Sequence, residues 1–299
     1  MSRLSPTDLL RAAMGAYRRG DMAAAQSLCD EVLRDQSQNI GGIFLKAVLC
    51  VANGDDAGAE RLFRATLGLD PAVADAHGNL AMIRRRQGRL AEAALLFHRA
   101  ARLAPDNPDW RVGHAMLRLD RPGEAAHDFR AAAALTPASA AVWRGLGLAL
   151  RPGDPTRAAR AFDRAFRLDP SLEVADSEAF ACRLQAADWR SYDRDRQRLE
   201  TRIDQGGTVL PLLTQLAGFD PGRQRHAAET VFRQQVASDK TQPFPRQRRH
   251  DHRLTVAYLS ADFHAHATAY LITGLLERHD RTRFRILAGC YGREDGSEA

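Results

Sequence analysis

The sequence is poor in cysteine and lysine, and it contains no long apolar run. Its four cysteines, Cys29, Cys50, Cys182 and Cys290, lie far apart and lack the spacing of a metal site. We therefore expect small buried apolar residues in a reducing compartment, with no bound metal. No apolar stretch approaches the about 20 residues needed to cross a bilayer, and no signal peptide is recognisable. These absences predict a cytoplasmic protein that makes no membrane contact.

Only Lys46 and Lys240 are lysines among the 43 basic residues, so the positive charge is carried almost entirely by arginine. The formal net charge is +6, which raises nucleic acid as a partner. However, the arginines are dispersed among 37 acidic residues and form no basic stripe with interleaved aromatics. We therefore expect a solvated surface of mixed charge and no nucleic-acid binding.

A repeat fills the first half of the chain. Prolines close successive units at a spacing of 32 to 34 residues: Pro71, Pro105, Pro137 and Pro170. An alanine and a phenylalanine precede each proline at constant distances: Ala59 and Phe63, Ala93 and Phe97, Ala125 and Phe129, Ala158 and Phe162. The alanine lets two helices approach closely, and the aromatic side chain one turn later fills the groove between them.

These units resemble the tetratricopeptide repeat, a helix-turn-helix unit of 34 residues. With an earlier unit that begins at Ser5, about five repeats over residues 5–172 predict a mainly helical α-solenoid. The resemblance implies a groove that binds acceptor proteins or peptides, and Asn79 is a predicted groove-facing residue. The ends of such an array can pair, which allows oligomers.

Residues 173–240 lose the repeat but keep a helical pattern, and we interpret them as a helical connector. One predicted helix ends at the Gly206-Gly207 pair and carries these residues on one face: Trp189, Tyr192, Leu199 and Ile203. Residues 241–252 hold two prolines and a dense Arg/His cluster. They are interpreted as a basic linker, with a phosphate-binding patch as the alternative.

The pattern changes again over residues 253–299. "RLTVAYLS" and "RFRILAGCYG" are typical of buried strands, and "TAYLITGLLERHD" between them predicts a helix. A strand, helix and strand of these lengths predict the first β-α-β unit of a parallel sheet, which is incomplete in this chain. Ligands bind beyond the carboxyl ends of such strands, where the loop with His264 and His266 would lie.

"RLTVAYLSADFHAHATAYLITGLLERHDRTRFRILAGCYGREDGS" resembles the start of the catalytic region of glycosyltransferase family 41, the O-linked N-acetylglucosamine transferases and their SPINDLY-like relatives. The resemblance implies a GT-B protein O-glycosyltransferase that moves N-acetylglucosamine or fucose to Ser or Thr. The co-substrate would be UDP-GlcNAc or GDP-fucose, without a further cofactor. The repeats would recruit the acceptor protein.

The family's "DFxxH" loop falls on Asp262, Phe263 and His266. The resemblance implies that His266 is the active-site histidine and a candidate general base, with Asp262 in support. The dipole of the following helix would favour a neutral imidazole that can accept a proton. The alternative is that His266 only caps that helix.

The chain stops at Ala299, before the second lobe that holds the nucleotide in this family. Donor-binding residues are therefore unassigned, and we expect this chain alone to be inactive as a transferase. The alternative interpretation is a non-catalytic tetratricopeptide scaffold that binds proteins.

Overall fold

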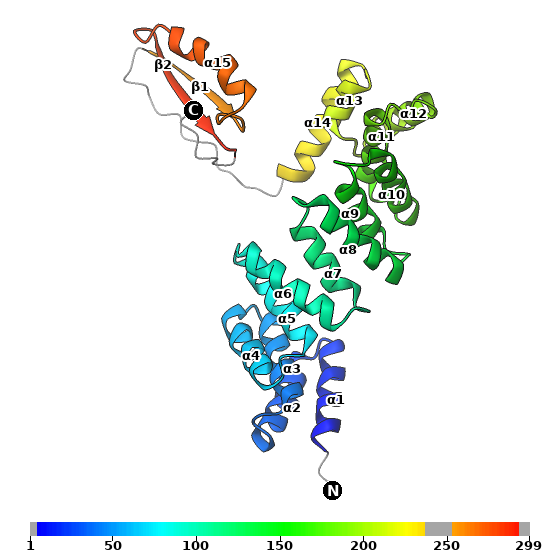
Figure 1. The fold of residues 1–299 in the computed structure, drawn as a ribbon, viewed down its shortest axis with the longest axis vertical. Coiled ribbons are helices and arrows are strands. Elements are labelled where there is room, and N and C mark those ends of the chain that lie inside the picture. The colour runs from blue at the N-terminus through cyan, green and yellow to red at the C-terminus, as the bar shows by residue number, and fades with distance from the viewer. Residues whose placement is uncertain (1–4, 237–252, 293–299) are drawn as a thin grey trace. The chain divides into compact units, whose positions relative to one another are not determined.

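The computed structural model describes residues 5–236 and 253–292 (Figure 1). The protein is mainly helical and divides into two compact units, Met1–Ser238 and Asp239–Ala299. The predicted linker, residues 241–252, lies outside the described residues.

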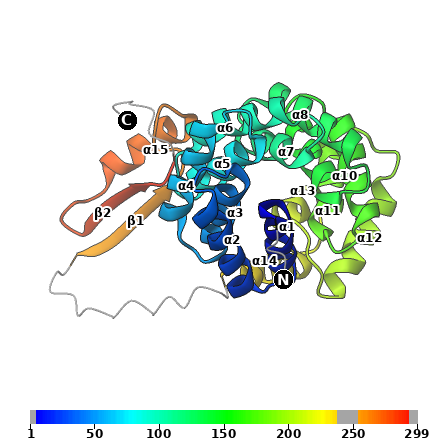
Figure 2. The ribbon, with the colours of Figure 1, turned by 90° about the horizontal axis from the view of Figure 1, so that it is seen from below.

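The first unit is an array of helices that follow one another as antiparallel pairs. Five pairs cover the predicted repeats: α1 (Pro6–Arg18) with α2 (Met22–Asp35), α3 (Ile40–Ala52) with α4 (Asp56–Leu69), α5 (Ala74–Arg86) with α6 (Leu90–Leu103), α7 (Pro108–Leu117) with α8 (Pro122–Leu135), and α9 (Ala140–Leu150) with α10 (Pro155–Leu168). Figure 2 shows these pairs succeeding one another along a curve. Each helix packs mainly against the helices before and after it.

Local signals in the sequence define where the helices of a pair end and begin. Gly20, Gly54 and Gly88 lie in the turn inside three pairs, with φ of 80°, 78° and 75°, a backbone conformation that glycine adopts without strain. The following Asp21 and Asp55 each accept a backbone N–H three residues ahead, at 3.0 and 2.8 Å. These contacts satisfy donors that the first turn of a helix leaves unpaired.

The predicted packing residues form the core of the array. Phe63, Phe97, Phe129 and Phe162 are at most 1% exposed, and the alanines that precede them are fully buried. Neighbouring helices approach so closely that a Cβ at Gly145 would lie 2.3 Å from the Phe129 ring. The alanine and phenylalanine pattern is therefore confirmed as the packing code of the helix pairs.

A buried ion pair joins the second helix pair to the third. The Arg84 side chain on α5 is 2% exposed, and its two terminal nitrogens donate to both carboxylate oxygens of Glu60 on α4, each at 2.6 Å. Arg84 also donates to Gln87 at 2.7 Å. The pair fixes the position of one helix pair on the next.

The packing continues beyond the predicted end of the repeats at residue 172. Ala175, Ala179 and Cys182 of α11 (Glu173–Gln185) share a core cluster with Phe162. Three further helices follow: α12 (Tyr192–Asp204), α13 (Pro211–Leu216) and α14 (Pro221–Val236).

An ionic seam holds α11 against α12. Asp176 is 2% exposed, and it accepts from Arg198 at 2.7 and 2.9 Å and pairs with Arg202 at 2.8 Å. Leu199 and Ile203 of α12 are buried as its predicted face requires, whereas Trp189 precedes the helix and is 60% exposed.

The second unit contains a parallel two-stranded sheet. Strand β1 (Leu254–Ser260) pairs with β2 (Phe284–Cys290), and α15 (Ala267–Arg278) connects them. Tyr270 and Leu271 on α15 are 75% and 84% exposed, so this part of its apolar side faces solvent.

The four cysteines carry free thiols, but they are not all buried. Cys29 and Cys182 are buried, and Cys50 is half-buried. Cys290 is exposed, so the prediction of a buried residue is wrong there. The reason is its place as the last residue of β2, in a two-stranded sheet with little to cover its end.

Candidate protein-binding surfaces

An apolar side chain recurs at the ninth position of the first helix in successive pairs and again on α11. These residues, here called the apolar stripe, are Met14, Val48, Met82, Met116, Leu148 and Ala181. Met14 and Met116 are 40% and 45% exposed, and the others are half-buried. Equivalent positions of stacked helix pairs lie on the same side of an array, so the stripe follows one side of the helices, where Val48 and Leu148 also pack against the core.

The side chains of the stripe can contact partner side chains of different shapes. On α7, Val112 lies one turn before Met116 and therefore on the same helix face. Methionine is unbranched and polarizable, so it can fit side chains of different shapes. Exposed apolar residues arranged in this way are typical of protein-binding surfaces.

Asn79 on α5 lies three residues before Met82. It is half-buried, and its side-chain amide donates to the backbone oxygen of Asp75 at 2.8 Å. The sixth residue of α7 and of α9 is glycine, Gly113 and Gly145. The predicted role of Asn79 in acceptor binding stays a prediction.

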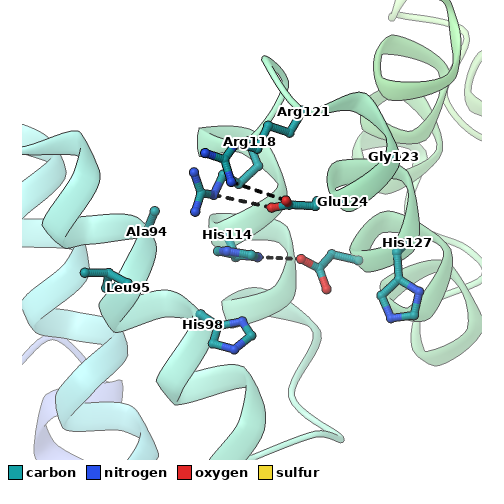
Figure 3. A pocket seen from close by; sticks show the side chains of 10 residues that line it. Ala94, Leu95, His98, His114, Arg118, Arg121, Gly123, Glu124 and His127 are labelled. Atoms are coloured by element: carbon teal, nitrogen blue, oxygen red, sulfur yellow. Dashed lines mark hydrogen bonds and ion pairs between the residues drawn. The ribbon is translucent and has the colours of Figure 1, made fainter. Parts of the chain in front are cut away.

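A second candidate surface is a cavity of about 530 Å³ that is lined by residues of α6, α7 and α8 (Figure 3). The side chains that line it include Ala94, Leu95 and His98 from α6, His114 from α7 and Arg118 at its C-cap, and Arg121, Glu124, His127 and Asp128 at the start of α8 and within it. The cavity, here called the polar pocket, therefore brings three histidines and two arginines together with two carboxylates.

Ion pairs organise the polar pocket. The Nδ1 atom of His114 lies 2.5 Å from an oxygen of Asp128, and both side chains are nearly buried. Glu124 lies 3.4 Å from Arg121 and 3.7 Å from Arg118 (Figure 3). Both carboxylates of the pocket are thus already engaged by the protein's own side chains.

The sequence patterns did not predict the polar pocket. A signal for it exists, because His114 is the seventh residue of α7, and leucine occupies the seventh position of α5 and α9, at Leu80 and Leu146. A histidine at a position that the two neighbouring repeats fill with leucine is a departure visible when these repeats are aligned.

The loop after β1 places the residues of the "DFxxH" motif at the start of α15. His266 is the N-cap of this helix, and its Nδ1 accepts from the backbone N–H of Thr268 at 3.2 Å. As an acceptor, Nδ1 carries no proton. The nearest Asp262 oxygen is 4.0 Å from this atom, which is too far for a hydrogen bond.

Helix capping by His266 is therefore observed, and it is compatible with the predicted active-site role. His266 and Asp262 are both about half-exposed on the carboxyl side of β1. Their catalytic roles stay predictions.

Two kinds of feature are absent from residues 5–236 and 253–292. No group of three or more His, Cys, Asp or Glu side chains is arranged to hold a metal ion. In the same ranges, no helix combines the length and apolar character that a membrane-spanning segment needs.

Comparison with known families identifies the helix pairs. A family model described as tetratricopeptide repeat matches residues 44–108 and 113–173. The helix pairs within these two ranges are tetratricopeptide repeats. The match covers the part of the array that carries Met82, Met116 and the polar pocket. A comparison with the curated proteins finds no match.

Solved structures share the tetratricopeptide fold at low sequence identity. PilF from Pseudomonas aeruginosa has a TM-score of 0.57 at 15% identity, with 75% of this chain and 97% of PilF covered. PilW, described as a type IV pilus biogenesis factor, has a TM-score of 0.51 at 15% identity, with 68% of this chain and 96% of PilW covered. At such identity the likeness concerns the fold alone.

Proposed function

We propose that this protein is a binding scaffold whose tetratricopeptide repeats receive an apolar segment of a partner protein along the apolar stripe. The recurrence of the stripe through six helices is the observation that supports the proposal. Packing within a helix pair does not require an exposed methionine, because the core is already filled by alanine and phenylalanine. The predicted cytoplasmic location and the pairing of array ends stay predictions.

A photo-crosslinker incorporated at the stripe tests this function. With p-benzoylphenylalanine in place of Met116, we expect covalent capture of a partner in cells, because residue 116 is exposed at the centre of the stripe. Mass spectrometry then identifies the captured protein and the segment that was crosslinked. The purified partner should bind Met116→Glu about tenfold or more weakly than the wild type, since a carboxylate would be desolvated in the contact.

The matched control is Leu135, which is 43% exposed at the end of α8 and lies outside the stripe. Crosslinking from residue 135 should not capture the same segment, and Leu135→Glu should leave affinity unchanged. Equal capture from both positions, or full affinity of Met116→Glu, would show that the stripe does not bind the partner.

A second proposal concerns residues 253–292, which we infer to be the start of a nucleotide-sugar transferase lobe. It rests on the resemblance to glycosyltransferase family 41 and is supported by the parallel pairing of β1 with β2. His266, which caps α15, lies at the carboxyl side of β1, where ligands of parallel sheets bind.

The transcript beyond the codon for Ala299 tests the transferase proposal. We expect an open reading frame that continues with alternating strand and helix patterns, because parallel strands need cover on both faces. A confirmed stop codon would contradict the proposal and leave the scaffold function alone. Turnover of UDP-GlcNAc or GDP-fucose by the purified 299-residue protein would contradict the expected inactivity of this chain.

A further inference from the structure

The polar pocket lies on the other side of α7 from the apolar stripe. His114 lies on α7 and Arg118 is the C-cap of this helix, and both line the pocket. Met116 is two residues from each of them, about 200° around the helix axis, so it points away from the pocket. The pocket is thus a surface separate from the one invoked in the proposed function, and the inference below does not rest on that function.

The polar pair in the pocket replaces residues that pack well elsewhere in the array. Asp128 is the seventh residue of α8, where α6 and α10 have Leu96 and Ala161. His114 likewise stands where α5 and α9 have leucine, although α3 has Lys46 at this position. Burying a polar pair costs more than burying apolar side chains of similar volume, so packing alone does not explain it.

The basic groups of the pocket exceed its acidic groups. Arg118 and Arg121 share the single carboxylate of Glu124, at 3.7 and 3.4 Å. The Nε of Arg118 is buried and faces Glu124 at the 3.7 Å of the ion pair, which is too far for a hydrogen bond. A buried guanidinium donor without an acceptor is costly, and a second carboxylate would satisfy it.

Two histidines, His98 from α6 and His114 from α7, also line the pocket. The rings of His98 and His114 have centroids 5.2 Å apart, and His98 is exposed at the rim. Because Nδ1 of His114 is already engaged by Asp128, its Nε2 and the ring of His98 are the imidazole atoms left to contact an anionic group.

The α6 side of the pocket, which carries His98, also carries apolar side chains. Leu95 is 69% exposed, and Ala94 lies beside it. A volume of about 530 Å³ is in the range of pockets that enclose small organic ligands, and it exceeds what a lone carboxylate needs. The occupant should therefore carry an apolar group next to its negative charge.

We propose that the polar pocket binds a peptide segment in which a carboxylate adjoins an apolar side chain. The carboxylate pairs with Arg118 and Arg121, and the apolar side chain covers Leu95. The carboxylate can belong to an acidic side chain or to a peptide C-terminus, because both offer the same two oxygens.

Peptide titrations monitored by the histidine C2–H resonances in NMR spectra test the proposal. One probe is the acetylated and amidated peptide Gly-Ser-Leu-Glu-Ser-Gly, and the other is acetyl-Gly-Ser-Gly-Ser-Leu with a free C-terminal carboxylate. Their counterparts carry glutamine in place of glutamate, or a C-terminal amide. We expect saturable shifts of the His98 and His114 resonances with at least one carboxylate probe, and none with its neutral counterpart. The probe that binds identifies the source of the carboxylate.

Variants assign the binding to the pocket. Arg118→Gln should weaken binding of the active probe about tenfold or more, as expected for loss of a charge-assisted hydrogen bond. Leu95→Glu should do the same through charge repulsion, and it changes an exposed residue that folding does not need. Arg102→Gln, an exposed arginine on the same helix as Leu95, should leave affinity unchanged.

The proposal is overturned if neither carboxylate probe produces saturable shifts at millimolar concentration, or if the neutral counterparts bind equally well. It is also overturned if Leu95→Glu, with wild-type thermal stability, binds the active probe with unchanged affinity.

Discussion

Glu60→Ala is expected to lower the free energy of unfolding by about 3–5 kcal/mol, because it leaves a buried charge without its partner. Arg84 is 2% exposed, and both oxygens of Glu60 accept from its terminal nitrogens. Gln87 remains in contact but supplies no charge, and the carboxylate of Glu92, 3.5 Å away, is half-exposed. Urea unfolding followed by circular dichroism measures the loss.

The control lies on the same two helices. Asp56 of α4 pairs with Arg86 of α5, but both side chains are at least one-third exposed. Exposed ion pairs contribute little, so Asp56→Ala should cost only a small fraction of the loss caused by Glu60→Ala. Equal losses would mean that burial does not set the energy of the Arg84 contact. The double variant Glu60→Leu, Arg84→Met should recover most of the stability.

The same pair predicts a dependence on pH. Hydrogen bonds from Arg84 lower the pKa of Glu60 from 4.5 to about 2. Because the folded-state pKa is the lower one, this stabilisation is fully present above about pH 4.5 and is lost as the pH falls toward 2. The difference in stability between the wild type and Glu60→Gln should therefore shrink over that range.

Asp176→Ala is expected to loosen α12 and to lower the free energy of unfolding by about 3 kcal/mol or more. The substitution removes the carboxylate between Arg198 and Arg202, and Arg202 is then left without a carboxylate partner in the described part of the chain. Hydrogen exchange should show faster exchange of the α12 amides, while α3 to α8 keep their protection because they do not contact the seam.

Asp188→Ala is the matched control. Asp188 pairs with Arg190, which is 86% exposed, and the pair joins no two helices. Stability and α12 protection should stay close to those of the wild type. If Asp176→Ala behaved in the same way, the ionic seam would not be what holds α12 on the array.

The helix pairs could be predicted because the same short pattern of packing residues recurs in each of them. An alanine and a phenylalanine at a fixed distance satisfy the close approach of any two helices, so the rule repeats with the sequence. The structure confirms it for Phe63, Phe97, Phe129 and Phe162.

The polar contacts could not be predicted in the same way, because they depend on which helix faces which. Arg84 and Glu60 are 24 residues apart, and they meet across the boundary between two repeats. His114 and Asp128 meet within a repeat whose first helix has 10 residues, whereas α5 has 13. Because α7 is shorter, His114 and Leu80 lie at different distances from the prolines that close their repeats. Counting back from those prolines therefore does not show that the two residues are equivalent.

In the C-terminal residues, too, the local features could be predicted from the sequence and the others could not. Strand and helix in residues 254–290 follow from local composition, and both are present, but the prediction that the strands are buried is wrong, since no residue of β1 or β2 is buried. The capping contact of His266 with Thr268 is also local, and it was one of the two alternatives the sequence offered. A catalytic role depends on a substrate, which local patterns do not describe.

Because each tetratricopeptide pair packs mainly against its neighbours, the array has the mechanics of a soft spring. A small tilt at every interface adds up along the chain and changes the pitch of the superhelix. The distances between methionines of successive helices change with that pitch. The stripe can therefore lengthen or shorten to match partner segments of different spacing without melting any helix.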